Sequence, residues 1–278
     1  MKIVGCVVLY NPSIENIENI IRYIPLLDHL YIMDNSDKIN EAIHEQLQGF
    51  QTVTIIDMGG NQGIGQALRQ GLDYAISEKA DFCLTMDQDS IFPVDKWSTI
   101  KAYLERTDID DYGIIGLNIN CPSTDVGLVH VNLLPTSGNF INVKNYLKTK
   151  GFRAELFIDS VDYELNHQFY KIGKKIAYIN EVSLGHTVGT PLYKRFFFKK
   201  VTVSNHSPIR CYYRFRNNYF LYREDKKFYR ECRWMDRKRL IQILLYEKQK
   251  KKKIKMILLG INHAKQKKLG PLNQEDIQ

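Results

Sequence analysis

Short apolar runs alternate with amphipathic segments along the first part of the chain. Four runs predict buried strands, at Ile3–Leu9, Leu30–Met33, Val53–Ile56 and Phe82–Met86. Between the first two, isoleucine and leucine recur at helical spacing after Ser13, a residue type that commonly caps a helix N-terminus. Strands separated by helices favour parallel pairing with right-handed crossovers. The pattern therefore predicts an α/β fold with a mostly parallel sheet.

Polar residues stand at the end of each predicted strand. In parallel sheets, ligands bind outside the carboxyl ends of the strands, and these ends meet at one edge. The residues expected at this edge are Tyr10, Asn11, Asp34, Asn61 and Gly63 in the turn Gly59–Gly65, Asp87 and Asp89. Their convergence predicts a nucleotide site. The glycine-rich turn lacks dinucleotide and P-loop spacing, so it is either a tight turn before a helix or a helix N-terminus beside an anion.

The fourth predicted strand ends in Asp87-Gln88-Asp89-Ser90. Two carboxylates one residue apart in a loop make a hard oxygen site, which suits Mg²⁺ or Mn²⁺ that also holds a diphosphate. Such a triplet is common in surface turns, so it indicates a metal site only together with the polar residues at the other strand ends. His186, which stands among glycines, could add a nitrogen ligand to this ion or be purely structural.

A second section begins after a predicted helix near Val94–Arg106. Further strands are predicted at Gly113–Leu117, Leu128–Leu133, Ser137–Val143, Ala177–Ile179 and Val182–Leu184, and Thr136-Ser137-Gly138 could let the backbone approach a substrate closely. Leu156–Gly173 has apolar residues on one helical face, so we expect a helix there. Its first turns carry Asp159 and Asp162, and Asp159 is equally well explained as a capping residue.

The bulk composition is that of an ordinary folded protein, with 44% hydrophobic and 25% charged residues among 278. Since no run approaches the roughly 20 apolar residues of a membrane span, and Met1-Lys2 leads directly into a strand, we expect a cytoplasmic protein. The five cysteines form no CxxC pair, which favours reduced thiols.

Charge is divided unevenly along the chain. Residues 194–278 contain 24 Lys and Arg against 7 Asp and Glu, whereas residues 1–193 contain 15 against 24. The basic tail interleaves cations with aromatic and aliphatic residues, which suits the surface of an anionic membrane; the alternative is a solvated basic helix pair packed on the core. A nucleic-acid-binding module is a distant alternative, because the acidic body would repel a polyanion.

With these residues assembled, the chain resembles the family 2 glycosyltransferases of the GT-A fold, and most of all bacterial rhamnosyltransferases that build surface polysaccharides. The matching pieces occur in the family's order: VVLYNP (7–12), DNS (34–36), NQGIGQA (61–67), MDQDS (86–90), TSG (136–138), LFIDSVDYEL (156–165), the step from His186 to Gly189, and SPIRCYYRFRN (207–217). The resemblance implies a Rossmann-like α/β/α sandwich with a mixed, mostly parallel sheet and a helical, basic C-terminal extension. It also implies a nucleotide-sugar-binding part at 1–110, an acceptor-binding and catalytic part at 111–200, and a membrane-associating extension at 201–278.

The resemblance implies a role for each matching residue. Asp162 would be the general base, and Asp34 would contact the nucleotide base. The implied sets are, for the donor nucleotide, Tyr10, Asn11, Asp34, Asn61, Gly63 and Asp87; for the metal, Asp87, Asp89 and His186; and for the acceptor or diphosphate, Ser137, Gly138, Asp159, Arg210 and Arg216. Two positions depart from the pattern, because Arg69 stands where an Asn is usual and Val161 where many members have Glu.

The implied activity is inverting, Mg²⁺- or Mn²⁺-dependent transfer of L-rhamnose from dTDP-L-rhamnose to a saccharide acceptor in synthesis of a capsule or O-antigen. We expect this acceptor to be lipid-linked, which would place the enzyme peripherally at the inner face of the plasma membrane, on anionic lipid, and we expect no nucleic-acid partner. A UDP-hexose or UDP-galactofuranose donor on the same scaffold is the alternative.

Overall fold

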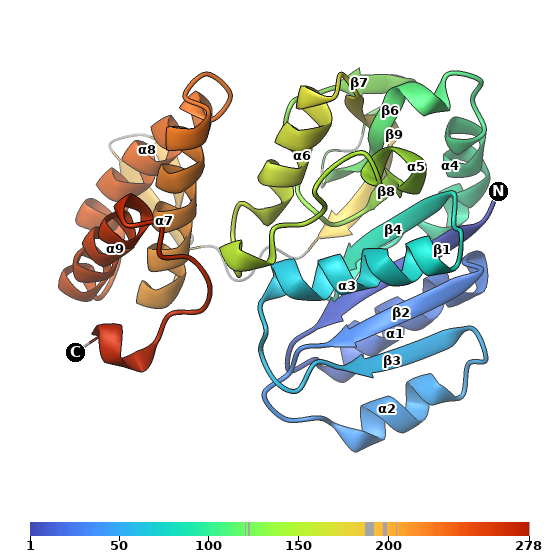
Figure 1. Ribbon diagram of the computed structural model, residues 1–278, viewed down its shortest axis with the longest axis horizontal. Helices are drawn as coiled ribbons and strands as arrows, with labels where there is room; N and C mark the ends of the chain where they lie inside the picture. The colour runs from blue at the N-terminus through green and yellow to red at the C-terminus, as the bar shows by residue number, and fades with distance from the viewer. Residues whose placement is uncertain (120, 122, 187–191, 197–198, 204, 278) are drawn as a thin grey trace. The chain divides into compact units, whose positions relative to one another are not determined.

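The computed structural model describes residues 1–119, 121, 123–186, 192–196, 199–203 and 205–277. The chain divides into two compact units (Figure 1). The first comprises Met1–Ala154 and Val161–Thr187, and the second comprises Glu155–Ser160 and Val188–Gln278.

The first unit is built on a mixed sheet of nine strands among the described residues, in the order β3-β2-β1-β4-β8-β6-β9-β5, with β7 beside β9. The strands are β1 Ile3–Leu9, β2 His29–Asp34, β3 Val53–Asp57, β4 Phe82–Asp87, β5 Ser90–Ile91, β6 Tyr112–Ile119, β7 Leu128–His130, β8 Asn139–Asn142 and β9 Lys175–His186. The first four pair in parallel, as the sequence predicts. Strand β8 is antiparallel to both β4 and β6, whereas β9 is parallel to β6.

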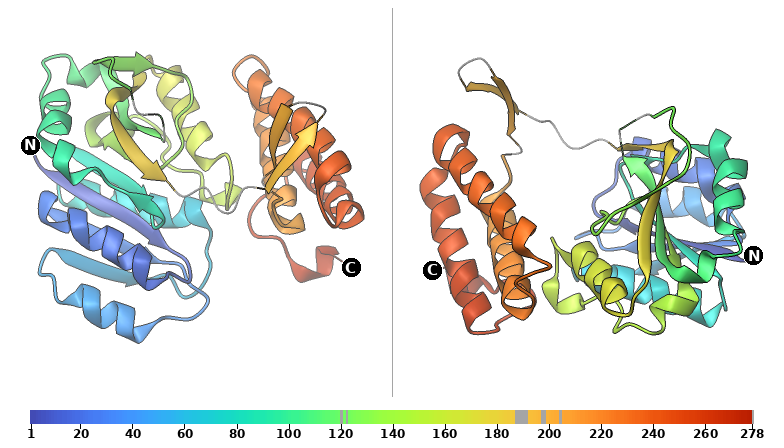
Figure 2. Two further views of the ribbon diagram at one scale, coloured as in Figure 1. Left: turned by 180° about the vertical axis from the view of Figure 1, so that it is seen from behind. Right: turned by 90° about the horizontal axis from the view of Figure 1, so that it is seen from above.

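Helices cover both faces of this sheet. They are α1 Ile14–Tyr23, α2 Glu41–Gln48, α3 Ile64–Ser77, α4 Trp97–Leu104, α5 Val143–Tyr146 and α6 Val161–Lys171. Figure 1 shows α3 and α6 on one face, and the view from behind in Figure 2 shows α1 and α2 on the other. On that second face, apolar side chains of α1, α2 and α4 join those of the strands in one core cluster.

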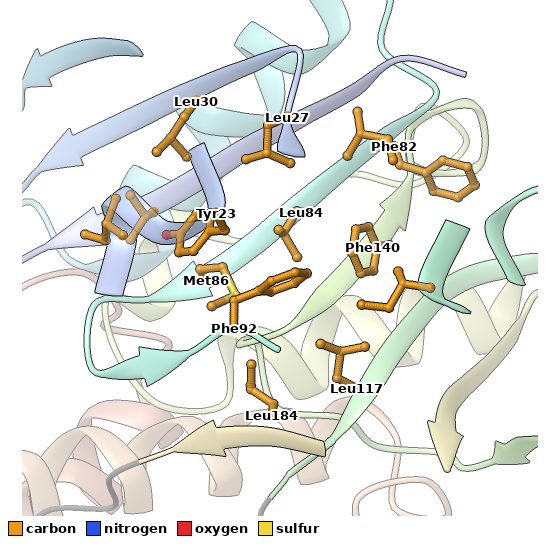
Figure 3. Packing of buried hydrophobic residues seen from close by; sticks show 14 of the residues in the cluster. Tyr23, Leu27, Leu30, Phe82, Leu84, Met86, Phe92, Leu117, Phe140 and Leu184 are labelled. Carbon is orange, nitrogen blue, oxygen red and sulfur yellow. The ribbon is translucent and has the colours of Figure 1, made fainter. Parts of the chain in front are cut away.

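Aromatic rings fill the middle of this core (Figure 3). Phe92 lies between Tyr23 and Phe140, with ring centroids 5.7 and 6.4 Å away. Leu84 and Leu117 bring β4 and β6 into the same cluster. Each of these side chains is nearly or fully buried, and full burial of such a side chain stabilises a fold by about 1.5–3 kcal/mol. This packing fixes the strand ends that carry the polar residues.

The predicted helix at Leu156–Gly173 is wrong at its N-terminal end. The helix α6 begins only at Val161, after a short 3-10 turn at Ala154–Leu156. Between them, Phe157, Asp159 and Ser160 have φ angles of 67°, 64° and 65°, in the left-handed region that costs about 1–2 kcal/mol for residues other than glycine. Periodicity could not reveal this break, because the apolar spacing continues across it.

The second unit holds a hairpin and three long helices. Its elements are β10 Leu192–Phe196, β11 Lys199–Val203, α7 Pro208–Glu224, α8 Arg230–Tyr246, α9 Lys250–Lys265 and the short turn η5 Gln274–Ile277. Ser207 caps α7 and Pro208 occupies its first turn. A core of Cys211, Phe215, Ile243 and Ile257 joins the three helices. Among the described residues, no helix is long and apolar enough to span a membrane.

An ion group is buried at the junction of α8 and α9. The Glu247 carboxylate lies 2.6 Å from Arg239 and 2.6 Å from Lys253. All three side chains are at most 5% exposed. Burial lowers the pKa of Arg239, and the neighbouring Glu247 opposes that shift. The carboxylate is therefore the counter-ion for two buried cations.

Candidate active site

The carboxyl ends of the first four strands lie level with one another. In the sheet register, Leu9 is opposite Asp34, Asp34 is opposite Asp57, and Val8 is opposite Asp87. The residues that follow these strands must therefore meet at one edge, which is where an open α/β sheet binds ligands. We call this edge, formed by residues 9–11, 34–37, 57–63 and 87–90, the strand-end edge.

Hydrogen bonds tie the loops of the strand-end edge together. The backbone N–H of Tyr10 donates to Gln88 Oε1 at 2.7 Å, and the Gln88 amide donates back to the Tyr10 carbonyl at 3.2 Å. The Asn11 N–H donates to Ser36 Oγ at 2.8 Å. The Tyr10 hydroxyl donates to Asp37 Oδ2 at 2.7 Å, and this hydrogen bond raises the pKa of Tyr10. Tyr10 itself is 44% exposed, so its ring remains accessible to a ligand.

Asp34 is buried at the end of β2 with both carboxylate oxygens engaged. Its Oδ1 accepts from the Ser36 N–H at 3.0 Å, and its Oδ2 lies 2.6 Å from Nε2 of His44 on α2. Asp34 is only 2% exposed. Nothing in the sequence singles out His44, since it stands ten residues further on in a separate helix. It fixes the orientation of the Asp34 carboxylate.

The glycine-rich turn is held from β2. Asn35 donates to Asn61 Oδ1 at 3.3 Å and accepts from the Gln62 N–H at 2.7 Å. Asn61 Oδ1 also accepts from the Gly63 N–H at 3.0 Å. Gly63 precedes α3 with a φ of 83°, a conformation that favours glycine. Asn61 and Gly63 thus lie beside the start of a helix on the strand-end edge, which is compatible with a nearby anion.

Asp87 and Asp89 flank the turn between β4 and β5. The Asp87 N–H donates to Ser137 Oγ at 3.0 Å, and the same Oγ lies 2.7 Å from Ser90 Oγ. Gly138, with a φ of 75°, donates its N–H to the Thr85 carbonyl at 2.8 Å. The predicted segment 136–138 therefore packs directly against the aspartate turn.

His186 is the last residue of β9, and its backbone pairs with Ser90, the residue after Asp89. Its side chain lies outside the described part of the chain, as do residues 187–191, which include the rest of the motif that ends at Gly189. Among the residues that the structure describes, no three His, Cys, Asp or Glu side chains form a group that could hold a metal ion. Two carboxylates do suffice for Mg²⁺ or Mn²⁺ when substrate phosphate and water complete the shell. Asp87 and Asp89 fit an ion held jointly with a diphosphate.

Asp162 is the second residue of α6. It lines a cavity of about 10 Å³ together with Thr85 of β4, Thr136 and Asn166. Its Oδ1 accepts from the Tyr163 N–H at 2.9 Å. The cavity has room for about one water molecule and is therefore too small for a substrate. Because Thr85 and Thr136 line the same cavity, Asp162 lies close to the segments that lead to Asp87 and Ser137.

Three residues predicted at the acceptor or diphosphate belong to the second unit. Asp159 pairs with Arg210 at 3.5 Å. Arg216 is 1% exposed and donates to the carbonyls of Gly270 at 2.6 Å and Leu156 at 3.0 Å. Its guanidinium also lies 4.9 Å from the Tyr213 ring centroid. The buried position of Arg216 favours a structural role over the contact that the sequence predicts.

A mostly parallel sheet with helices on both faces, and an aspartate turn at its carboxyl edge, is the arrangement expected of the GT-A fold. The chain belongs to glycosyl transferase family 2, whose model matches residues 12–159. It is therefore a glycosyltransferase. It is similar to "dTDP-rhamnosyl transferase RfbF" of Shigella flexneri, with 24% identity over an alignment of 243 residues that covers 81% of this chain and 81% of that protein.

Solved structures share the fold at low sequence identity. The chain is similar to S. aureus TarS, with a TM-score of 0.54 and 14% identity over 95% of this chain and 43% of that one. It is also similar to GalNAc-T7 crystallised with UDP, GalNAc and Mn²⁺, with a TM-score of 0.56 and 11% identity over 67% of this chain and 44% of that one. The chain thus spans less than half the length of either protein, and these likenesses show the fold alone.

Proposed function

We propose that the protein is an inverting, metal-dependent rhamnosyltransferase. It would transfer L-rhamnose from dTDP-L-rhamnose to a lipid-linked saccharide during synthesis of a bacterial surface polysaccharide, working at the inner face of the plasma membrane. The observation that carries the proposal is the meeting of Asp34, Asp87 and Asp89 at the strand-end edge, with Asp162 bordering the same region. The similarity to a dTDP-rhamnosyl transferase along most of both chains supports the choice of sugar.

The chemistry needs a base on one side of the sugar and charge neutralisation on the other. In inverting transfer, an acceptor hydroxyl attacks the anomeric carbon as the bond to the departing diphosphate breaks. The Asp162 carboxylate would take the hydroxyl proton. Asp87 and Asp89 would hold the Mg²⁺ or Mn²⁺ ion, which supplies positive charge for the diphosphate leaving group. The ring of Tyr10 and the turn at Asn61 would contact the nucleotide.

A substitution at Asp162 tests the assignment. In Asp162→Asn, an amide of nearly the same shape cannot take the proton, so release of dTDP should fall by about 10²–10⁴-fold. Donor affinity should stay close to that of the wild type, because the proposed donor contacts lie on the strand-end edge, to which Asp162 does not belong. The matched control is Asp111→Asn, an exposed aspartate directly before β6, at the opposite end of the sheet. Unchanged turnover in Asp162→Asn would exclude this residue as the base.

The donor is tested separately from the mechanism. Thermal shift with dTDP-rhamnose, UDP-hexose and UDP-galactofuranose, each with and without Mn²⁺, should give the largest stabilisation with dTDP-rhamnose plus the ion. Stabilisation by a UDP-sugar alone would keep the transferase class and replace the sugar. Release of nucleotide in the presence of a lipid-linked acceptor then tests the proposed acceptor.

A further inference from the structure

Helix α8 carries a row of apolar side chains that are not used in the core of its own unit. Trp234 is 54% exposed, Ile241 56%, Leu244 50% and Leu245 52%. Positions 234, 241 and 245 follow helical spacing and lie along one side of the helix, with 244 beside them. Other positions of α8, among them Cys232, Asp236, Arg239 and Ile243, are buried. We call the exposed side, with Trp234, Arg237, Lys238, Ile241, Leu244 and Leu245, the outward face of α8.

The outward face itself carries two exposed cations, Arg237 and Lys238, and no acid. The stretch around it is basic as well, because residues 230–255 contain eleven Lys and Arg, of which Arg233, Arg239 and Lys253 are paired with buried acids, but only three Asp and Glu. Two of these acids are committed inside the unit, since Asp236 pairs with Arg214 and Arg233, and Glu247 pairs with Arg239 and Lys253. Only Glu231 remains as an exposed acid in this stretch. The Lys238 ammonium lies 3.2 Å from the centroid of the Trp234 ring, so a cation and an aromatic ring share one position on the face.

This combination of side chains selects the kind of partner. A second copy of the chain would bring the same cations against each other across a symmetric interface, which is unfavourable. A nucleic acid would satisfy the cations and stack on Trp234, but it would leave the aliphatic side chains of Ile241, Leu244 and Leu245 without an apolar partner. An anionic lipid surface satisfies both features: its headgroups attract Lys and Arg, and its outer acyl region accepts tryptophan and aliphatic side chains.

We propose that the outward face of α8 docks on the surface of an anionic membrane. Trp234, Ile241 and Leu245 enter the interface between headgroups and acyl chains, while Arg237 and Lys238 stay at headgroup level. The helix lies on the membrane and does not cross it. Docking would bring the enzyme to a lipid-linked acceptor, and only this purpose rests on the proposed function.

Tryptophan fluorescence of the full chain tests the proposal. The chain has two tryptophans, so Trp97→Phe leaves Trp234 as the only reporter. Vesicles of phosphatidylglycerol and phosphatidylcholine, in a ratio of about one to two, should shift the Trp234 emission to the blue and sediment with the protein. Phosphatidylcholine alone should do neither, and added salt should weaken the binding.

Two substitutions on the face provide the variant, and an exposed leucine elsewhere provides its control. Ile241→Gln combined with Leu245→Gln should weaken vesicle binding by about tenfold or more, because each replaces an aliphatic side chain that enters the lipid. Leu147→Gln, at a leucine of the first unit that is 61% exposed, should bind like the wild type. Circular dichroism checks that both variants remain folded.

Several outcomes would overturn the proposal. Wild-type vesicle binding by the double variant would do so, as would an unshifted Trp234 emission in protein that sediments. Dimers that dissociate in the double variant would assign the face to a second copy, and tighter binding to RNA than to vesicles would assign it to nucleic acid. Vesicle binding needs neither donor nor turnover, so it can succeed when dTDP release fails; conversely, the double variant should keep its activity on a detergent-soluble acceptor.

Discussion

The side chain of Ser137 and the backbone of Asp87 are joined by a hydrogen bond of 3.0 Å, in which the Asp87 N–H donates to Ser137 Oγ. The same Oγ lies 2.7 Å from Ser90 Oγ, so one hydroxyl is bonded to both ends of the aspartate turn. Ser137 is 2% exposed, so its hydroxyl holds the turn from the interior of the unit. The segment between residues 136 and 138 therefore sets the position of the carboxylates that precede and follow Gln88.

Replacing Ser137 with alanine should loosen this turn. Ser137→Ala removes an acceptor from a partly buried N–H, and a neutral hydrogen bond contributes about 0.5–1.5 kcal/mol. We expect donor affinity in the presence of Mn²⁺ to fall by about two- to tenfold, measured by calorimetric titration with dTDP-rhamnose. Ser77→Ala, which removes an exposed hydroxyl bonded to a carbonyl of its own helix, is the control. Donor affinity equal to the wild type would show that Ser137 does not position the turn.

Asp89→Asn should uncouple donor binding from the metal ion. The wild type should bind dTDP-rhamnose more tightly with Mn²⁺ than with a chelator, because the ion joins carboxylates to diphosphate. In the variant, we expect the two affinities to become similar. Asp95→Asn changes an aspartate whose side chain is 74% exposed and should leave the metal effect intact. A full metal effect in Asp89→Asn would remove this residue from the proposed ligand set.

Asn217 should matter for both stability and turnover. Its side-chain amide donates to the carbonyls of Leu156, Ile158 and Asp159 at 2.8, 2.8 and 2.9 Å, within the segment of left-handed residues that precedes α6. Asn217→Leu leaves these carbonyls without that donor, at a cost of about 1–3 kcal/mol in the free energy of unfolding.

We expect Asn217→Leu to lower kcat while donor affinity is kept, because the disturbed segment leads into Asp162. Urea unfolding and dTDP release measure the two effects. Asn262→Leu, at an exposed position of α9, is the control. A variant with normal kcat and reduced stability would limit Asn217 to a structural role.

His206 should make the second unit less stable in mild acid. Burial lowers the pKa of His206 to about 4, and Arg210, Arg239, Arg214 and Lys253 add to the shift. Because the folded state then binds fewer protons than the unfolded state, stability is fully present above about pH 6.5 and is lost as the pH falls towards 4. Melting temperatures at about pH 7 and pH 5 should differ less in His206→Gln than in the wild type. An unchanged difference would show that His206 is not the titrating group.

Removing Glu247 should destabilise the helices of the second unit more than any surface change. Glu247→Ala leaves Arg239 and Lys253 as buried cations without their shared counter-ion, which costs about 3–5 kcal/mol. Urea unfolding followed by circular dichroism should report this loss. Glu231→Ala, at an exposed position of α8, should change stability by no more than about 0.5 kcal/mol. Similar unfolding curves for the two variants would contradict the proposed role of the ion group.

The first four strands could be predicted because each is a short apolar run that ends in polar residues. That pattern also indicated where their ends meet, and the register of Asp34 and Asp87 against β1 agrees. Later strands were predicted less well. Residues 128–133 were expected as one strand, but β7 ends at His130, and the two runs around 177–184 form a single strand, β9. These strands pair with partners far along the chain, which local patterns do not encode.

The parts of the site that the sequence did not reveal depend on tertiary contacts. His44 approaches Asp34 because α2, which packs against β3 and α1, brings it back to the end of β2. The burial of Arg216 follows from the aromatic rings and carbonyls around it, whereas the family resemblance implied a contact with the acceptor or diphosphate. Motifs identify the residue types that a reaction needs, but side-chain partners decide which cations remain available to a substrate.

The segment Glu155–Ser160 belongs to the second unit although it is flanked on both sides by the first. The polypeptide therefore passes between the units more than once. Two residues of α7 bind this segment: Asn217 donates to the Leu156 carbonyl, and Asn218 accepts from Ser160 Oγ at 2.6 Å. A protein trimmed after residue 187 would keep the entire nine-stranded sheet yet lose these anchors one residue before α6. The C-terminal helices therefore cannot be removed without loss of these hydrogen bonds, and a minimal catalytic fragment would have to retain α7.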